Sequence, residues 1–127
     1  MLARTLAYLF PGIDFTRDVV IQAATGIVDW RRPEPQPTPA EIAAAELPSA
    51  KAAAIAANRA ECSARIYARY PPGRQLSALA GLYDSANVAT MTDWIAANIS
   101  AENTAADLIE AATTVQAVEA VSVSWPA

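Results

Sequence analysis

A run of alternating prolines divides the chain and limits the folds open to it. Four prolines alternate with other residues in this run: Pro33, Pro35, Pro37 and Pro39. Proline fixes its own φ angle and restricts the preceding residue to extended geometry. We therefore expect a stiff, polyproline-like linker over residues 31–38, with a small head in residues 1–30 and a helical module in residues 39–127.

The pattern before the linker predicts a short helix followed by a β-hairpin. Leu2, Leu6 and Leu9 recur at helical spacing, and Pro11-Gly12 is a strong stop signal. Two segments rich in β-branched residues then flank a turn at Thr25-Gly26. These segments are Val19, Val20 and Ile21, and Ile27, Val28, Asp29 and Trp30. A two-stranded hairpin is marginal alone, so we expect it to lean on the first helix or on another chain.

The pattern after the linker predicts helices. Thr38 can cap a helix that begins at Pro39, and Glu41 completes a capping box. We expect this helix to end at Leu47, because Pro48 follows, and Ser49 to cap a second helix that reaches about Tyr70. The larger apolar residues of that second helix lie on one face.

The pattern in the rest of the chain predicts a corner followed by further helices that pack back on the preceding helix. Pro71-Pro72-Gly73 predicts a corner, and a shorter helix is marked by Leu76, Leu79, Leu82 and Tyr83. We then expect a long helix over residues 87–112, with Trp94 on its apolar stripe. A further turn of helix is expected at Val115 and Val118. Residues 121–125 alternate like a short strand. The predicted fold is α+β, mostly α, with a C-terminal antiparallel helical hairpin or three-helix bundle.

Alanine makes up 31 of the 127 residues, which limits how much apolar surface the helices bury. Alanine-rich helices form readily but need close partners. We therefore expect a homo- or hetero-oligomer.

Composition argues against catalysis. The chain has no histidine, one cysteine at Cys62, and glycines that are scattered singly. Zinc sites of the usual Cys and His type, Cys/His nucleophile pairs and phosphate-binding glycine loops are therefore excluded. We expect a protein that is not an enzyme and has no cofactor or metal, with Cys62 as a buried apolar residue.

Charge is distributed unevenly along the chain. All nine basic residues lie between Arg4 and Arg74, whereas residues 75–127 contain six acids and no base. Nucleic-acid binding by this acidic part is not expected, since phosphate affinity needs Lys or Arg. The acids form either a solvated helix face or a surface for a basic partner. No apolar run reaches the length of a membrane span, and we expect the chain to fold in a cytoplasm.

Several segments together resemble a family of short bacteriophage proteins. The run LFPGIDFTRDVVIQAATGIVDWRRPEPQPTPAEI, from Leu9 to Ile42, is similar to their Y-P-G-x-D-F segment, hairpin ending in Trp, and alternating prolines. RIYARYPPGRQLSAL, MTDWI and the terminal Trp-Pro continue the likeness. The chain departs from the pattern after Phe15, where an acidic, glycine-rich turn is missing, and at Pro72-Gly73, where a bulky residue is usual.

The resemblance implies a tail-fibre assembly chaperone, with a structural tail or tail-fibre subunit of the virion as the alternative. The implied partner is a tail-fibre or other tail protein, met in the host cytoplasm during assembly or in the virion tail. We expect the hairpin residues Val19, Val20, Ile21, Ile27 and Val28 to add as an edge to a partner sheet. The other predicted partner-binding residues are Trp30, Arg31, Arg32 and Trp125, although the simpler expectation is that each serves its own head, linker or tail.

Overall fold

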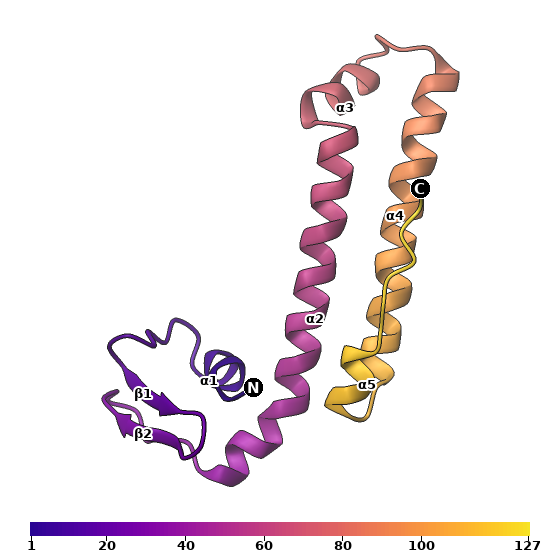
Figure 1. Cartoon of the computed structure of the whole chain (residues 1–127). Coiled ribbons are helices and arrows are strands. Elements are labelled where there is room, and N and C mark those ends of the chain that lie inside the picture. Colours follow the sequence, from indigo (N-terminus) through magenta and orange to yellow (C-terminus); the bar gives the residue numbers. More distant parts are fainter.

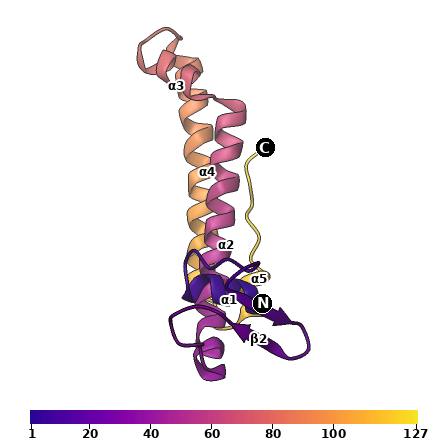
Figure 2. The same ribbon diagram turned by 90° about the vertical axis from the view of Figure 1, so that its left-hand side faces the viewer.

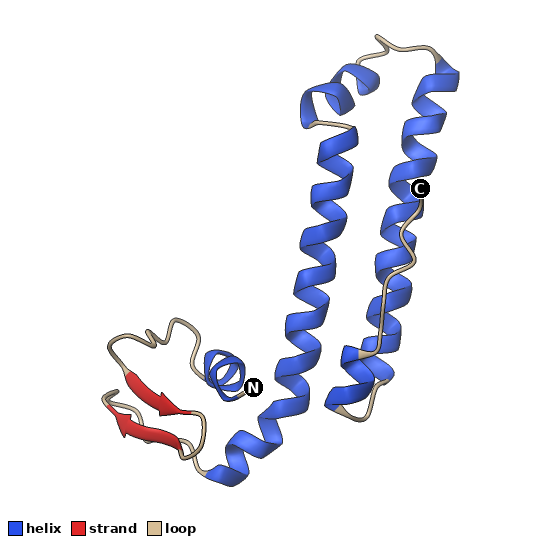
Figure 3. Cartoon of the chain, viewed as in Figure 1, coloured by secondary structure: helices blue, strands red, loops and turns tan.

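The computed structural model describes all residues, 1–127, as a long two-helix arm with a small head at its base (Figure 1). The elements in chain order are α1 (Leu2–Leu9), β1 (Val19–Gln22), β2 (Gly26–Trp30), α2 (Pro39–Arg69), α3 (Pro72–Leu79), α4 (Ser85–Ala111) and α5 (Val115–Glu119). Strands occur only in the head (Figure 3). The fold is α+β and mostly α, as predicted.

The head consists of α1 and the predicted hairpin. β1 and β2 pair antiparallel, with Val19 opposite Trp30 and a register shift between Val20 and Ile21. Gly26 follows the turn with φ +78°, a conformation that side chains with a Cβ rarely adopt. Both predicted strands and the glycine turn between them are therefore confirmed.

The linker is not a straight spacer. Its first residues bend, and the indole Nε1 of Trp30 donates a hydrogen bond to the Glu34 carbonyl at 2.6 Å. Pro37 is buried. Beside it, α1 packs on α2, and the Thr5 and Ser49 hydroxyls lie 3.4 Å apart in the buried contact. The head is therefore held against the base of the arm.

The predicted helix break at Pro48 is wrong, because α2 continues through this proline. A proline has no N–H for the carbonyl four residues earlier, and the lower part of α2 bends away from the arm's axis in Figure 1. Ser49 does not cap a new helix; its hydroxyl donates to the Glu46 carbonyl at 2.9 Å. Packing of α1 on Ser49 stabilises the bent helix at this point. The capping box of Thr38 and Glu41 at the start of α2 is confirmed.

The arm is an antiparallel hairpin of α2 and α4, rather than a three-helix bundle. At its base α5 closes a core in which Ala50, Ile109 and Val118 are 2%, 1% and 3% exposed. Further along, Cys62 is buried as predicted, and burial raises the pKa of its thiol. No helix of the chain combines the length and apolar character that a membrane crossing requires.

Two predictions about the later segments are wrong in part. Residues 121–127 form no strand; they run back along the arm as an extended segment (Figures 1 and 3). No other strand lies beside them, so their polar contacts are with helix side chains. Pro72 and Gly73 begin α3 instead of ending the preceding structure, and Leu82 and Tyr83 lie in the loop after α3.

Candidate interaction site

The far end of the arm is built by helix stop and start signals. α2 ends before Tyr70, whose N–H bonds to the Ile66 carbonyl, and Pro72 then starts α3. Gly81, with φ +78°, turns the chain after α3. Asp84 caps α4, because its carboxylate accepts a hydrogen bond from the Asn87 N–H at 2.8 Å. These signals place α3 and its following loop across the end of the arm.

A small core supports this end. Tyr70, Ala78 and Met91 are buried together, and the Tyr70 and Trp94 rings meet edge to face with centroids 5.7 Å apart. Arg69 lies over the Trp94 ring at 4.6 Å. Aromatic packing therefore fixes the end of α2 to the start of α4.

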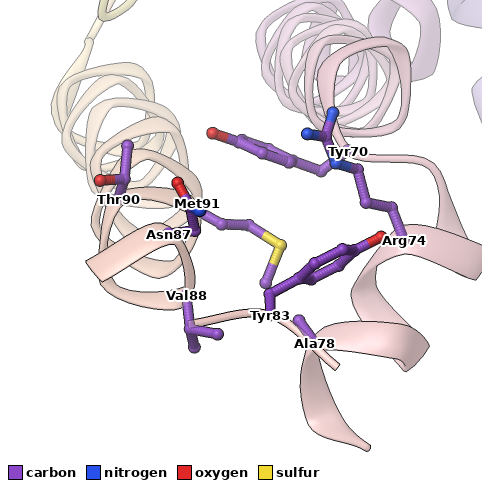
Figure 4. A pocket seen from close by; sticks show the side chains of 8 residues that line it. All are labelled: Tyr70, Arg74, Ala78, Tyr83, Asn87, Val88, Thr90 and Met91. Carbon is purple, nitrogen blue, oxygen red and sulfur yellow. The ribbon is translucent and has the colours of Figure 1, made fainter. Parts of the chain in front are cut away.

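A cavity of about 130 Å³ opens beside this core (Figure 4). It is lined by side chains from the residue after α2, from α3, from α4 and from the loop between these two helices: Tyr70, Arg74, Ala78, Tyr83, Asn87, Val88, Thr90 and Met91. Arg74 lies over the Tyr70 ring at 5.6 Å and forms no ion pair within the chain. The cavity thus combines aromatic and thioether walls with one cation that is free to pair with a carboxylate.

Three leucines near this cavity project into solvent, and Tyr83, which lines the cavity, is partly exposed. Leu76, Leu79, Leu82 and Tyr83 are 65%, 85%, 73% and 40% exposed. We call these four residues the leucine tip. Folded chains rarely expose several large apolar side chains together unless the surface binds something. The leucine tip is therefore the candidate interaction site.

The sequence pattern predicted a short helix at the tip leucines and gave no indication of their exposure. Their spacing of three residues is the same for a buried and an exposed helical face. The available signal was length: α3 spans only Pro72–Leu79, between a proline corner and Gly81. A helix of two turns has few neighbours against which to bury several leucines.

The predicted partner-binding residues of the hairpin divide between the two sides of the sheet. Val19 is buried at 3%, whereas Val20 and Val28 are 36% and 53% exposed. Ile21 and Ile27 are half-buried. Since a two-stranded sheet leaves each strand an outer edge, addition of a partner strand stays a prediction.

The remaining predicted residues are engaged within the chain. The Trp30 ring meets the Phe10 ring at 5.1 Å. Arg32 bonds to Asp18 at 3.1 Å and to Glu34 at 2.8 Å. The structure therefore places these side chains in the head's own packing.

Two predicted residues lie outside that cluster. Arg31 pairs with Asp29 at 2.6 Å on the exposed side of β2. Trp125 packs on the arm, with the Arg65 guanidinium of α2 5.2 Å from its ring centroid. The structure thus does not bring Trp125 together with the hairpin residues.

The fold and this site define a mostly helical α+β protein with an exposed apolar end. The chain has no group of three or more Asp, Glu or Cys side chains that could hold a metal ion. Residues 2–55 match the family model described as XkdW protein, which is phage-related. This similarity covers the head, the linker and α2 to a point just beyond its bend, and it supports a phage protein. No curated protein and no solved structure matches the chain significantly.

Proposed function

We propose that this protein is a bacteriophage tail-fibre assembly chaperone that binds the fibre protein through the leucine tip. The observation that supports this most is the exposure of Leu76, Leu79 and Leu82, between 65% and 85%, at the end of a long arm. Similarity of residues 2–55 to a phage-related family supports the phage setting. The chaperone acts in the host cytoplasm during assembly.

The chemistry of the tip suits a folding fibre. Intertwined β-rich trimers expose apolar surfaces and unpaired strand edges before they close, and these cause aggregation. Leu79 and its neighbours can cover apolar surface without sequence-specific hydrogen bonds. Arg74, beside the cavity, can pair with one carboxylate of the client. No cofactor is needed, since binding alone keeps the client from aggregating.

The alternative is a structural tail or tail-fibre subunit retained in the mature virion. The same exposed leucines favour it, because permanent interfaces are more hydrophobic than transient ones. The two roles differ in where the protein ends up. A chaperone leaves, whereas a subunit is found in purified particles at a fixed ratio to other tail proteins.

The decisive experiment is co-expression with the tail-fibre protein of the same phage. We expect soluble, trimeric fibre with the wild-type chain and mostly insoluble fibre without it. Leu79→Asp should return the fibre to the insoluble fraction, because it places a charge in the apolar contact. Val28→Asp is the matched control, since Val28 is also an exposed apolar residue but lies on the hairpin.

Each outcome has a defined meaning. Fibre that folds equally well without the protein contradicts the chaperone proposal. Loss of soluble fibre with Val28→Asp but not with Leu79→Asp would move the binding surface to the hairpin. Detection of the protein in denaturing gels of purified virions, at a fixed ratio, would favour the structural subunit.

A further inference from the structure

One broad face of the arm is covered by the chain's own C-terminal segment. Arg65 donates to the Pro126 carbonyl at 2.5 Å and to the Asn98 side chain at 3.0 Å. The indole of Trp94 donates to the Ala127 oxygen at 2.8 Å. These contacts involve both α2 and α4, so the segment lies over the groove between them. Figure 2 shows it on one side of the arm and no element on the other side of the arm's middle.

The uncovered side consists mainly of small and apolar residues at helical spacing, with one basic and one acidic residue among them. Residues three, four and seven apart share one helix face, which assigns this side from each helix. We call the following residues the open face: Ala56, Arg59, Ser63 and Tyr67 of α2, and Ile95, Ile99, Glu102 and Ala106 of α4. Tyr67 and Ile99 are 54% and 45% exposed. Small residues beside a few large ones suit close packing of further helices.

The open face also contains a buried carboxylate without a hydrogen-bond partner. Glu102 is 7% exposed, and its Oε1 accepts no hydrogen bond within the chain. The nearest cation is Arg59, whose Nε lies 3.6 Å from that oxygen, and the Arg59 side chain is 71% exposed. A buried acceptor without a donor is costly, and the negative charge of Glu102 favours a further cation at the adjoining surface of the arm.

The total surface is larger than a single folded chain of this mass normally has. The accessible surface is 7882 Å², whereas mass scaling gives about 6,500 Å² for a monomer of this size. The excess of about 1,400 Å² is greater than the roughly 800 Å² that one partner buries in a standard interface. The chain as a whole therefore has enough excess surface for a stable dimer.

We infer that a second copy of this chain packs on the open face, forming a four-helix bundle from two arms. With the two-fold axis along the arm, α2 of each copy lies against α4 of the other, and all neighbouring helices are antiparallel. This arrangement brings Arg59 of the second copy towards Glu102, so each oppositely charged pair repeats across the interface. The alternative axis, across the arm, would place Arg59 against Arg59.

The dimer also arranges the two tips, and it does not depend on the proposed function. Two arms that run in the same direction place both leucine tips at one end and both heads at the other. The dimer would present two apolar tips to a client.

Native mass measured on the full chain tests the inference. At micromolar concentration we expect twice the mass of the 13.4 kDa chain. Ile99→Asp should raise the dimer dissociation constant at least about 100-fold, because it buries a charge in the interface. Leu108→Asp is the matched control, since Leu108 is 56% exposed on the same helix but lines a groove with Ser122 and Ser124 of the C-terminal segment.

The results separate the possibilities. A wild-type chain with the mass of one copy overturns the inference. A dimer that survives Ile99→Asp but is lost with Leu108→Asp or Leu79→Asp also overturns it, because the contact then lies elsewhere. Circular dichroism of each variant checks folding, and Ser63→Arg provides a second open-face variant with an exposed starting residue.

The direction of the two arms is tested by distance measurement. Spin labels are attached to Leu82→Cys in a Cys62→Ala chain, so that each copy has one label at its tip. Parallel arms place the two labels well under 40 Å apart. Antiparallel arms separate them by at least about 40 Å, the length of the 27-residue helix α4. The longer distance would overturn the proposed axis.

Discussion

The two ends of the arm differ in how many elements surround them. At the base, α1, the bent start of α2 and α5 converge, and Leu6, Ile109 and Val118 are 0%, 1% and 3% exposed. At the far end only α3 and a loop cross the hairpin, and Leu79 is 85% exposed. The same type of side chain is therefore buried at one end and solvated at the other.

This difference shows that apolar content alone does not produce a core. A helix needs neighbours on its apolar stripe, and two helices side by side cover only part of each other. The base obtains additional neighbours from α1 and α5, elements far apart in the sequence. At the tip no further helix packs on α3, so its leucines remain available to a partner.

The largest expected difference is in the free energy of unfolding. Ile109→Ala should destabilise the chain by about 2–5 kcal/mol, because it leaves a cavity in the base core. Leu79→Ala should change stability by less than about 0.5 kcal/mol, since its side chain is already solvated. Urea denaturation of both variants measures the difference. Similar losses for the two would contradict the contrast between base and tip.

Arg65 of α2 connects the C-terminal segment and α4 through hydrogen bonds. Arg65→Ala removes the bonds to Asn98 and Pro126 and the contact with Trp125, and should cost about 1–3 kcal/mol. Limited proteolysis should then cleave the released segment after a shorter digestion time. Arg74→Ala is the control, because Arg74 forms no ion pair, and it should leave the cleavage pattern unchanged.

Helix caps should be equally important at both ends, because a cap acts within its own helix. Thr38→Ala at the base and Asp84→Ala at the tip should each cost about 1 kcal/mol. Thermal unfolding of the two variants measures this. A negligible loss for Asp84→Ala would show that the tip is not ordered by its local signals.

The smallest effect is a pH dependence confined to the head. Hydrogen bonds from Arg17 and from the Asp14 backbone hold the pKa of Asp18 below its ordinary value of 3.8. A lowered pKa means that the stabilising contribution is present above that value and is lost as pH falls through the folded pKa. Head amide protection, followed by NMR between pH 5 and pH 2, should therefore decline at the acid end.

Asp18→Asn provides the control for that titration. The amide cannot titrate, so the decline at the acid end should be reduced in this variant. An unchanged acid transition would assign the pH dependence to other carboxylates, such as Asp14, whose pKa is also lowered, mainly by a hydrogen bond from the Thr16 side chain.

Sequence reasoning succeeded where the signal is local. The capping box of Thr38 and Glu41, the stop at Pro11-Gly12 and the turn before Gly26 each involve residues that are close along the chain. It failed where the outcome depends on distant neighbours. Pro48 was predicted to end a helix, yet packing of α1 against Ser49 accompanies a bend instead.

The candidate site shows the same limit. The spacing of the tip leucines predicted a helix, and α3 is one, but spacing contains no information on what covers a face. Trp30 and Arg32 were predicted as partner contacts on their chemistry; the structure places them against Phe10 and Asp18, and their contact with a partner stays a prediction. The sequence did not show what Trp125 packs against, and the structure places its ring beside Arg65 of α2.

The sequence by itself determined the types of most elements, the hairpin of the head and the unusual shortage of bulky side chains for a core. Periodicity, caps and breakers act over a few residues, so they can be recognised without a structure. Only the tertiary structure decided that the head docks on α2, that one face of the arm is covered and the other open, and that the leucines at the tip are exposed. Burial depends on neighbours that are distant in the sequence, and helix periodicity is the same whether those neighbours exist or not.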